Sequence, residues 1–342
     1  MPWNWGIQAK SAFAAGLYHT RALRLADAVR PQGPIVLAYH RVLPEGHEQA
    51  AFIQPGMYVT SATLERHMGY LREWYNVVPL DEIFTQRTPA RTCAVTFDDG
   101  WADNYAWAFP VLATYGIPAT IFLATNLIGT TQWPWPDRLC LHVHTLPVSD
   151  VLSVVNEAFR KIGRPPMRLG AVSTDRYAAA DAMVAALKPL PPPLVDAVLA
   201  KLTGMSTGAD AGLRGQRPWL TWDEVSEMSQ AGIAFGSHTH NHRILTQAPV
   251  GEARREIEDS RDMLAAKIGK RVTTFCYPNG NYNSELMHLV ADSGFQIAVT
   301  TERGRVDLAG SPMAVNRLMI HDDMTSTVPM FACVITRTVP FF

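Results

Sequence analysis

The chain has 342 residues, 47% of them hydrophobic and 18% charged, and its 30 basic and 31 acidic side chains leave a formal net charge of −1. This composition excludes a disordered or low-complexity chain, which lacks the apolar content that offsets the entropy of ordering. It also argues against a general nucleic-acid binder, since such proteins carry a basic excess. The four cysteines form no CxxC pair, which favours a reducing compartment over a zinc knot or a disulfide framework.

The N-terminal segment, residues 1–33, is predicted to be an amphipathic helical segment. It interleaves apolar with basic side chains, namely Trp3, Trp5, Ile7, Phe13, Leu17, Leu25, Lys10, Arg21, Arg24 and Arg30. The helix could rest on anionic lipid, but we favour packing on its own domain, which is the common case for such a pattern. No apolar run reaches the roughly 18 residues that span a bilayer, and the N-terminus lacks a secretory pattern. We expect a cytoplasmic location, with peripheral contact to the inner membrane face as the lipid-bound alternative.

Strands and helices then alternate. Short apolar or β-branched runs predict strands at Pro34–His40, Arg91–Phe97 and Pro118–Thr125. Apolar residues at three- and four-residue spacing predict helices at Thr60–Tyr75, behind a polar cap, and at Asn104–Tyr115.

The alternation stops near residue 126 and resumes near residue 217. A WPWP run, Ala-rich stretches and a Pro-rich run at residues 189–193 predict a helical insertion between these points. The chain after the insertion predicts helices at Trp222–Gln230, Gly251–Ile268 and Asn283–Ser293, and strands at Ile233–Ser237, Thr273–Tyr277, Gln296–Thr300 and Ala314–Ile320. About seven β/α units emerge, which is typical of a parallel sheet or barrel.

Two adjacent aspartates, Asp98 and Asp99, follow the strand that ends at Phe97. In a barrel, the carboxyl ends of the strands are where catalytic groups gather. One carboxylate could ligate a cation while the other, kept ionised by that charge, accepts a proton. A solvated Asp-Asp-Gly turn is the alternative.

Three imidazoles, those of His238, His240 and His242, follow the strand that ends at Ser237. Neutral imidazole is a favoured ligand of zinc-type cations, and three protein ligands with one water form the usual open catalytic arrangement. Two of these histidines and one of the aspartates would supply that set. Surface histidines in a loop are the alternative.

Two further strand ends carry polar groups. Tyr277, Pro278 and Asn279 enter a Pro/Gly turn, whose backbone N–H groups could bind a developing oxyanion. His321 closes the last strand, where it could act as a general acid. An ordinary loop and a partly exposed histidine are the respective alternatives.

These four segments, in this order, resemble the polysaccharide deacetylase family, also called the NodB-homology domain or carbohydrate esterase family 4. The TFDDG run at residues 96–100 matches the first family motif, and His238-Thr-x-x-His242 matches the second, H-[ST]-x-x-H. The Pro278-Asn279-Gly280 turn is similar to the third motif, R-x-P-Y-G, and the LMIH run ending at His321 is similar to the fifth, L-x-I-H.

The resemblance covers about residues 34–125 and 217–321. It implies an α/β fold, a distorted (β/α)7-type barrel formed by residues 34–125 and 217–342. Residues 126–216 would be the helical insertion and could cap the site.

Carried over residue by residue, the resemblance implies that Asp99, His238 and His242 hold one divalent metal ion, preferably Zn²⁺. Asp98 would be the general base and His321 the general acid.

Other residues are expected around this centre. Asn279, with Pro278 and Tyr277, would bind the oxyanion or the substrate. His240 is expected to be a neighbour of the metal rather than a ligand. His40 and Tyr39 would lie at the rim of the site, because their strand ends at the same edge.

The sequence departs from the family at the third motif. The family arginine that orients the base falls at Cys276, and a thiol cannot make a charge-assisted bond to Asp98. We hypothesise that Arg317, on the strand that leads to His321, replaces it. The chain also shows no clear counterpart of the fourth-motif tryptophan.

The predicted activity is metal-dependent removal of an N-acetyl group from an amino-sugar unit, with release of acetate. The substrate would be a polysaccharide, an oligosaccharide or a lipid- or nucleotide-linked glycan precursor. Trp133, Trp135 and Trp219 could stack on sugar rings or belong to the core. A non-catalytic carbohydrate-binding protein and a small-molecule amidohydrolase are the alternatives.

Overall fold

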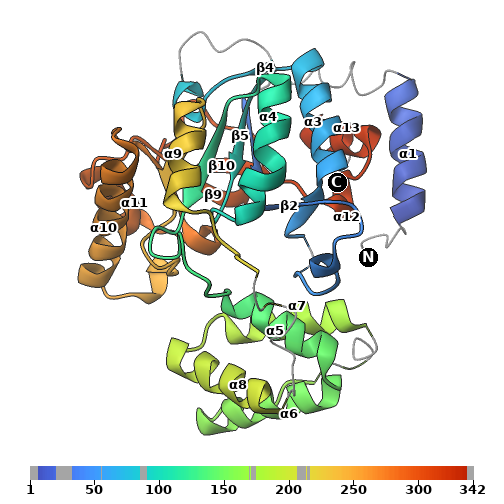
Figure 1. Cartoon of the computed structure of the whole chain (residues 1–342), viewed down its shortest axis with the longest axis vertical. Helices are drawn as coiled ribbons and strands as arrows, with labels where there is room; N and C mark the ends of the chain where they lie inside the picture. Colours follow the sequence, from blue (N-terminus) through green and yellow to red (C-terminus); the bar gives the residue numbers. More distant parts are fainter. Residues whose placement is uncertain are drawn as a thin grey trace. The chain divides into compact units, whose positions relative to one another are not determined.

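A computed structural model of the protein describes residues 7–20, 33–54, 56–84, 91–168, 170, 175–205, 213 and 216–336. The chain divides into two compact units (Figure 1). The first comprises Met1–Glu45, Tyr58–Thr130 and Trp219–Phe342, and the second comprises Gly46–Met57 and Thr131–Pro218. The second unit thus contains most of the expected insertion together with Gly46–Met57, a stretch that we had assigned to the barrel.

Seven parallel strands of the first unit close into a ring. They are β1 (Ile35–Tyr39), β5 (Thr92–Phe97), β6 (Ala119–Leu123), β7 (Ala234–Ser237), β8 (Thr274–Cys276), β9 (Ile297–Arg303) and β10 (Val315–Met319). Neighbours follow the order β1-β10-β9-β8-β7-β6-β5, and β5 pairs back with β1, with Leu37 opposite Val95. The expected (β/α)7-type barrel is therefore confirmed.

The strands follow from their apolar sequences. Every residue of β1, β5 and β6 is buried, as expected for parallel strands that are covered on both faces. Val36, Phe122 and Val299 come from three different strands and join one apolar cluster. Because the strands are parallel, their carboxyl ends lie at one end of the barrel, which gathers the residues that follow them.

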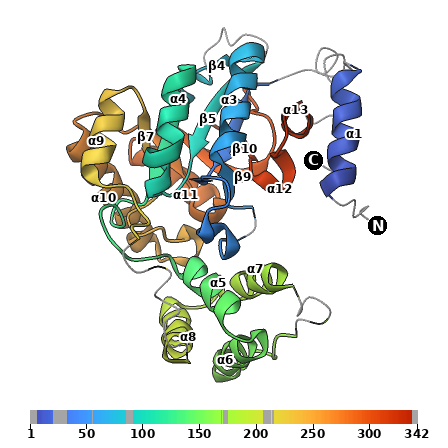
Figure 2. The same ribbon diagram turned by 45° about the vertical axis from the view of Figure 1, so that its right-hand side comes forward.

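Three of the described connecting helices, α3 (Ser61–Trp74), α9 (Trp222–Gln230) and α11 (Ser284–Asp292), begin at polar caps. Thr60 caps α3 by accepting a hydrogen bond from the backbone of Thr63, and Thr221 and Glu224 form a capping box at α9. Figures 1 and 2 show α3 beside α4 (Phe109–Tyr115) along the barrel, and the two helices are in contact.

The remaining elements of the barrel unit are mostly short. The predicted helix at Asn104–Tyr115 opens with a π-helical turn, η3 (Asn104–Ala108). The others are β2 (Arg41–Leu43), β3 (Tyr58–Thr60), β4 (Asn76–Val77), η2 (Leu80–Glu82), η6 (Leu245–Gln247), α10 (Val250–Ile268), η7 (Pro278–Gly280), α11 (Ser284–Asp292) and α12 (Asp322–Thr325). β4 pairs with the start of β5, whereas β2 and β3 form a separate parallel pair.

The N-terminal helix α1 (Ile7–His19) packs against α13 (Val328–Thr336), an apolar helix that the sequence analysis did not predict. The packing supports the interpretation that we favoured for this segment. Trp3, Trp5 and the basic residues from Arg21 to Arg30 lie outside the described residues. No helix in the described ranges is both long and apolar enough to cross a bilayer.

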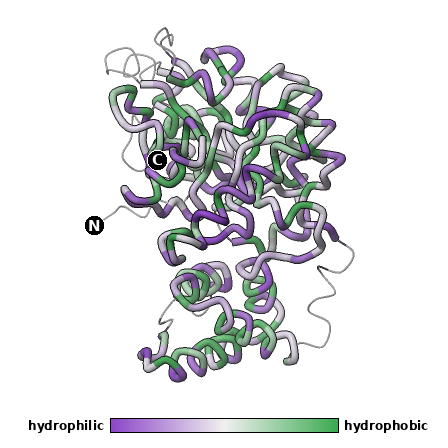
Figure 3. Tube along the Cα trace, turned by 90° about the vertical axis from the view of Figure 1, so that its left-hand side faces the viewer, coloured by the Kyte–Doolittle hydropathy of each residue, from purple (hydrophilic) through white to green (hydrophobic). Residues whose placement is uncertain are grey.

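The second unit is built from four helices, α5 (Trp135–Thr145), α6 (Val148–Lys161), α7 (Arg176–Leu187) and α8 (Pro192–Met205). Hydrophobic and hydrophilic residues alternate along these helices (Figure 3). Their apolar side chains, Leu139, Val155, Met183 and Leu199 among them, form a core of the unit's own. The 3-10 turn η1 (Glu48–Ala51) belongs here, since Ala50 accepts a hydrogen bond from Tyr177 and Gln54 donates one to Asp181.

Candidate active site

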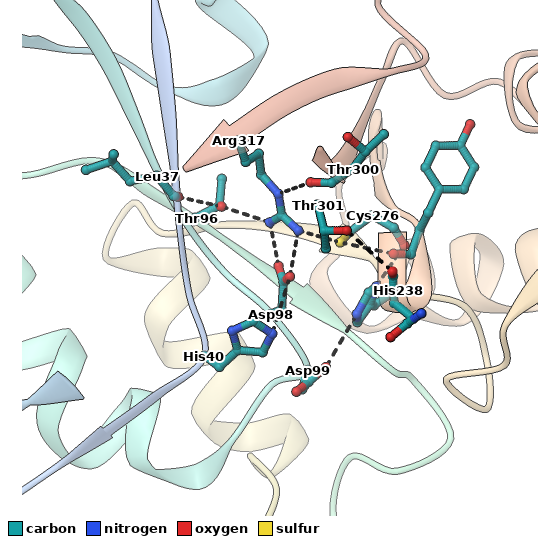
Figure 4. Close-up of polar contacts among 12 residues, drawn as sticks. Leu37, His40, Thr96, Asp98, Asp99, His238, Cys276, Thr300, Thr301 and Arg317 are labelled. Carbon is teal, nitrogen blue, oxygen red and sulfur yellow. Dashed lines mark hydrogen bonds and ion pairs between the residues drawn. The ribbon is translucent and has the colours of Figure 1, made fainter. Parts of the chain in front are cut away.

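Polar side chains from five strand ends of the barrel gather in one place. Asp98 and Asp99 follow β5, His238 follows β7, and Arg317 lies on β10. Figure 4 shows these residues with Cys276, the last residue of β8, and with His40, which follows β1.

Asp99 faces two imidazoles. Its Oδ1 lies 3.4 Å from Nε2 of His238 and 3.3 Å from Nε2 of His242. One ligand atom from each of the three residues lies within 4.8 Å of the other two, a spacing suited to a single metal ion. The structure therefore brings together the three residues that the resemblance implied as ligands.

The orientation of His238 fixes which ring nitrogen is available. Its Nδ1 lies 2.7 Å from the backbone oxygen of Cys276. Because a carbonyl oxygen can only accept, Nδ1 carries a hydrogen, and Nε2, on the Asp99 side, is the nitrogen left to bind a cation. Metal-bound histidines usually show this arrangement, and one carboxylate with two such imidazoles is a donor set that suits Zn²⁺. The residues present thus fit a divalent ion.

Left-handed backbone is concentrated at this site. Five non-glycine residues in the described ranges have a positive φ, and four of them are Asp99 (76°), Thr239 (66°), His242 (56°) and Asn279 (57°). Such conformations carry strain and persist where the surroundings hold them, which is common at functional sites. Gly100 has a φ of 84°, and an added Cβ there would lie 2.6 Å from Cδ2 of Leu123, so that this position favours glycine.

Arg317, on β10, holds Asp98 through both of its carboxylate oxygens. Its Nη1 and Nη2 donate to the two carboxylate oxygens of Asp98 at 2.8 and 2.7 Å. The remaining N–H groups donate to the backbone oxygen of Thr300, to Oγ1 of Thr96 and to Sγ of Cys276, at 2.8, 3.1 and 3.3 Å. All five donors of this fully buried guanidinium are therefore paired.

The pairing decides the charge of Asp98. Burial by itself would raise the pKa of this carboxyl, but the charge and hydrogen bonds of Arg317 outweigh that effect and lower the pKa below its ordinary value. Burial raises the pKa of the Cys276 thiol, so that a neutral sulfur accepts the bond from Arg317. The guanidinium thus lies against the residue that stands where the family has its arginine.

His40 lies near the other side of Asp98, with its Nε2 3.8 Å from Oδ2 (Figure 4). Burial lowers the pKa of His40. The expectation that Tyr39 also lines the rim is wrong, because successive residues of a strand point to opposite sides. Tyr39 is buried, stacks on Phe97 and shares a hydrogen bond with Nδ1 of His67.

The turn after β8 contains Tyr277, Pro278 and Asn279, and the side chain of Tyr277 is buried. Tyr277 is buried and its hydroxyl donates to the backbone oxygen of Met313, which corrects its expected role in substrate contact. Asn279 has left-handed backbone and its side chain donates to Asn281. At Gly280 an added Cβ would lie 1.9 Å from Oγ1 of Thr301, so that this turn admits only glycine.

His321 follows β10 beside the end of β1, where the N–H of Ile320 donates to the backbone oxygen of Ala38. Its Nδ1 lies 3.2 Å from Oδ2 of Asp323. His240 shares a hydrogen bond with Oγ1 of Thr125 and is absent from the described clusters that could bind a metal.

The sequence analysis missed the surroundings of Asp99. Trp101 donates from Nε1 to Oδ2 of Asp99 at 2.9 Å and stacks on Trp219. Trp219 is therefore a core residue, 2% exposed, rather than a sugar platform. The one available signal was the tryptophan that directly follows the Asp-Asp-Gly run.

Comparison with known proteins agrees with this geometry. A family model described as polysaccharide deacetylase matches residues 85–298, more than half of the chain. YxkH of Bacillus subtilis (strain 168), which carries the name of a polysaccharide deacetylase, is 23% identical over 275 residues, or 79% of this chain and 68% of YxkH.

Solved structures with the same fold include two with high coverage. The Streptococcus pyogenes deacetylase PplD, in complex with acetate, has a TM-score of 0.56 at 21% identity and covers 86% of this chain and 96% of its own. IcaB from Ammonifex degensii has a TM-score of 0.55 at 18% identity and covers 89% of this chain and 98% of its own. With the barrel and the family match, these observations show that the chain belongs to the polysaccharide deacetylase family.

Proposed function

We propose that this protein uses one Zn²⁺ ion to hydrolyse the acetamide of an N-acetylated amino-sugar unit, releasing acetate and a free amine. The observation that carries the proposal is the placement of the Arg317-bound Asp98 next to the cluster of Asp99, His238 and His242. A base and a cation site side by side are what metal-assisted amide hydrolysis requires.

Asp99, His238 and His242 would hold the ion. When bound, the ion would polarise the acetamide carbonyl and lower the pKa of the attacking water. The backbone hydrogen bond of His238 would keep its imidazole oriented for this role.

Asp98 would accept the proton of the attacking water. Arg317 keeps the carboxylate of Asp98 ionised and fixed. Each oxygen of Asp98 retains a second lone pair that can take a proton. Arg317 would thus be the positioning residue for the base, in place of the arginine that the family has at Cys276. The contact between Arg317 and Asp98 argues against the alternative of a carbohydrate-binding protein that lost its activity together with the family arginine.

Two further groups would complete the reaction. His321, beside Asp323, would protonate the departing amine. The turn that contains Pro278 and Asn279 would present backbone N–H to the developing oxyanion. His40, 3.8 Å from Asp98, would line the rim of the site.

The substrate class and the location remain predictions from the sequence. We infer a glycan or a lipid- or nucleotide-linked precursor, handled in the cytoplasm or at the inner membrane face, with the helical unit acting as a cap. Fractionation of cells that produce the protein would test the location.

Acetate release tests the activity. Purified protein with Zn²⁺ should release acetate from N-acetylglucosamine oligomers, and an Asp98→Asn variant should release it about 10²- to 10⁴-fold more slowly. Binding of the oligomers without acetate release would favour the carbohydrate-binding alternative. Turnover of small acetamides alone would favour the amidohydrolase.

A further inference from the structure

The carboxylate of Asp99 divides its two oxygens between two tasks. Oδ1 faces Nε2 of both His238 and His242, at 3.4 and 3.3 Å. Oδ2 points away from them and accepts a hydrogen bond of 2.9 Å from Nε1 of Trp101. One oxygen of Asp99 is thus held by the indole while the other faces the two imidazoles.

Trp101 is held from several directions. Its ring is 2% exposed, stacks on Trp219 with centroids 4.6 Å apart, and carries the guanidinium of Arg41 4.3 Å from its centroid. Arg41 is itself paired with Asp103 at 2.8 Å. A change in the tilt of the indole would disturb all these contacts, so that its N–H points in a fixed direction.

The backbone adds to this restraint. Trp101 and Trp219 form an antiparallel bridge, and the N–H of Leu220 donates to the backbone oxygen of Gly100 at 2.9 Å. The chain that returns from the helical insertion is thereby joined to the loop that carries Asp99.

Asp99 needs such a partner. Its φ of 76° is strained for a residue with a side chain, and rotation about the terminal bond of a carboxylate is soft. We propose that Trp101 is a positioning residue, which fixes the Asp99 carboxylate in the orientation that binds the cation through Oδ1. This inference rests on the metal site of the proposed function and adds a residue to it.

Zn²⁺ affinity of the full chain tests the inference, measured by competition with a chromogenic chelator. Trp101→Phe keeps a six-membered aromatic ring in the stack and removes the indole N–H together with the five-membered ring. We expect it to weaken Zn²⁺ binding by about 10- to 100-fold, as loss of an outer partner of a metal ligand usually does. Trp219→Phe is the matched control, which alters the same stack without touching Asp99, and should stay within about threefold of wild type.

Thermal unfolding in excess chelator separates positioning from folding. Both variants should unfold at similar temperatures without metal, and Zn²⁺ should raise the unfolding temperature of Trp101→Phe less than that of Trp219→Phe. Should Trp101→Phe not fold, Trp101→Leu is compared with Trp219→Leu, since both remove the stack and only the first removes the hydrogen bond to Asp99.

Unchanged Zn²⁺ affinity in Trp101→Phe would overturn the inference and leave the proposed function standing. Equal losses in both tryptophan variants would also overturn it, because the stack rather than the hydrogen bond would then set the affinity. A wild-type chain that binds no Zn²⁺ would overturn the proposed function as well.

Discussion

The surroundings of Asp98 and Asp99 differ sharply although the two residues are adjacent. Asp98 is 2% exposed and engaged through both oxygens by a guanidinium whose five donors are all paired. Asp99 has one oxygen bound to an indole and the other turned toward two imidazoles, of which His242 is well exposed.

The difference shows how one strand end can serve two roles. Around Asp98, two N–H groups of Arg317 bind the two carboxylate oxygens, so that the carboxylate is fixed and its pKa is lowered. Around Asp99, three groups that share a preference for a cation face one another. The first environment keeps a proton acceptor ionised and oriented, and the second brings together groups that can bind a metal ion.

The largest effects are expected when the carboxylate of Asp98 or Asp99 is replaced by an amide. Asp99→Asn should abolish Zn²⁺ binding and acetate release together, because a charged ligand is lost. Asp98→Asn should lower the turnover number by about 10²- to 10⁴-fold while Zn²⁺ still binds, because only the base is lost. Acetate assays and zinc analysis of both proteins check this.

Thermal unfolding is the control for these variants. Asp98→Asn leaves Arg317 buried without a counter-charge, which can lower the free energy of unfolding by about 3–5 kcal/mol. Loss of bound zinc from folded Asp98→Asn protein would contradict the division of roles.

Removal of the metal separates the two environments without a mutation. A chelator should abolish acetate release reversibly, and added Zn²⁺ should restore it. Because Arg317 and Asp98 pair without the ion, the chelated protein should remain folded, as circular dichroism would show. Full activity in excess chelator would contradict the metal-dependent mechanism.

Arg317→Lys tests whether the two hydrogen bonds from Arg317 position Asp98. A lysine keeps the charge but has three donors at one point, so that it cannot hold both oxygens of Asp98 and reach Thr96, Thr300 and Cys276 as well. We expect the turnover number to fall by roughly 10- to 100-fold, with KM and Zn²⁺ affinity little changed. Unchanged turnover in this variant and in Arg317→Ala would remove Arg317 from the mechanism.

The smallest effect is expected at Cys276, which accepts one bond from Arg317. Cys276→Ala leaves one buried N–H without an acceptor and should lower the free energy of unfolding by about 1–3 kcal/mol. Cys276→Ser supplies an oxygen in place of the sulfur and should lose less. Chemical denaturation of both variants measures the difference, and equal losses would show that the bond contributes nothing.

The barrel was predictable because its signals are local. The apolar runs at β1, β5 and β6 are buried over their whole length, and the structure begins and ends α9 at the predicted residues. Two features were missed. Helix α13 was not predicted, and Gly46–Met57 joined the second unit through bonds such as that between Gln54 and Asp181. The residues of a helix or a loop do not by themselves show which other part of the chain it packs against.

The site was predictable in part. The strand-end rule and the family resemblance pointed to Asp98, Asp99, His238 and His242, and the structure places these residues together. The direction of a side chain was harder to predict. Tyr39 points into the core because successive residues of a strand point to opposite sides, and its hydroxyl bonds to His67. Tyr277 is buried, and its hydroxyl donates to the backbone oxygen of Met313.

The order of strands and helices, the strand ends that carry acids and imidazoles, and the absence of an arginine at Cys276 could all be predicted from the amino-acid sequence. These depend on residue type and on spacing along the chain, which hydrophobic periodicity and chemistry make visible. The pairing of Arg317 with both oxygens of Asp98 and the hydrogen bond from Trp101 to Asp99 became visible only in the folded chain. Closure of the barrel brings β10 and β5 to the two sides of β1, and buried donors must then find acceptors wherever the fold puts them.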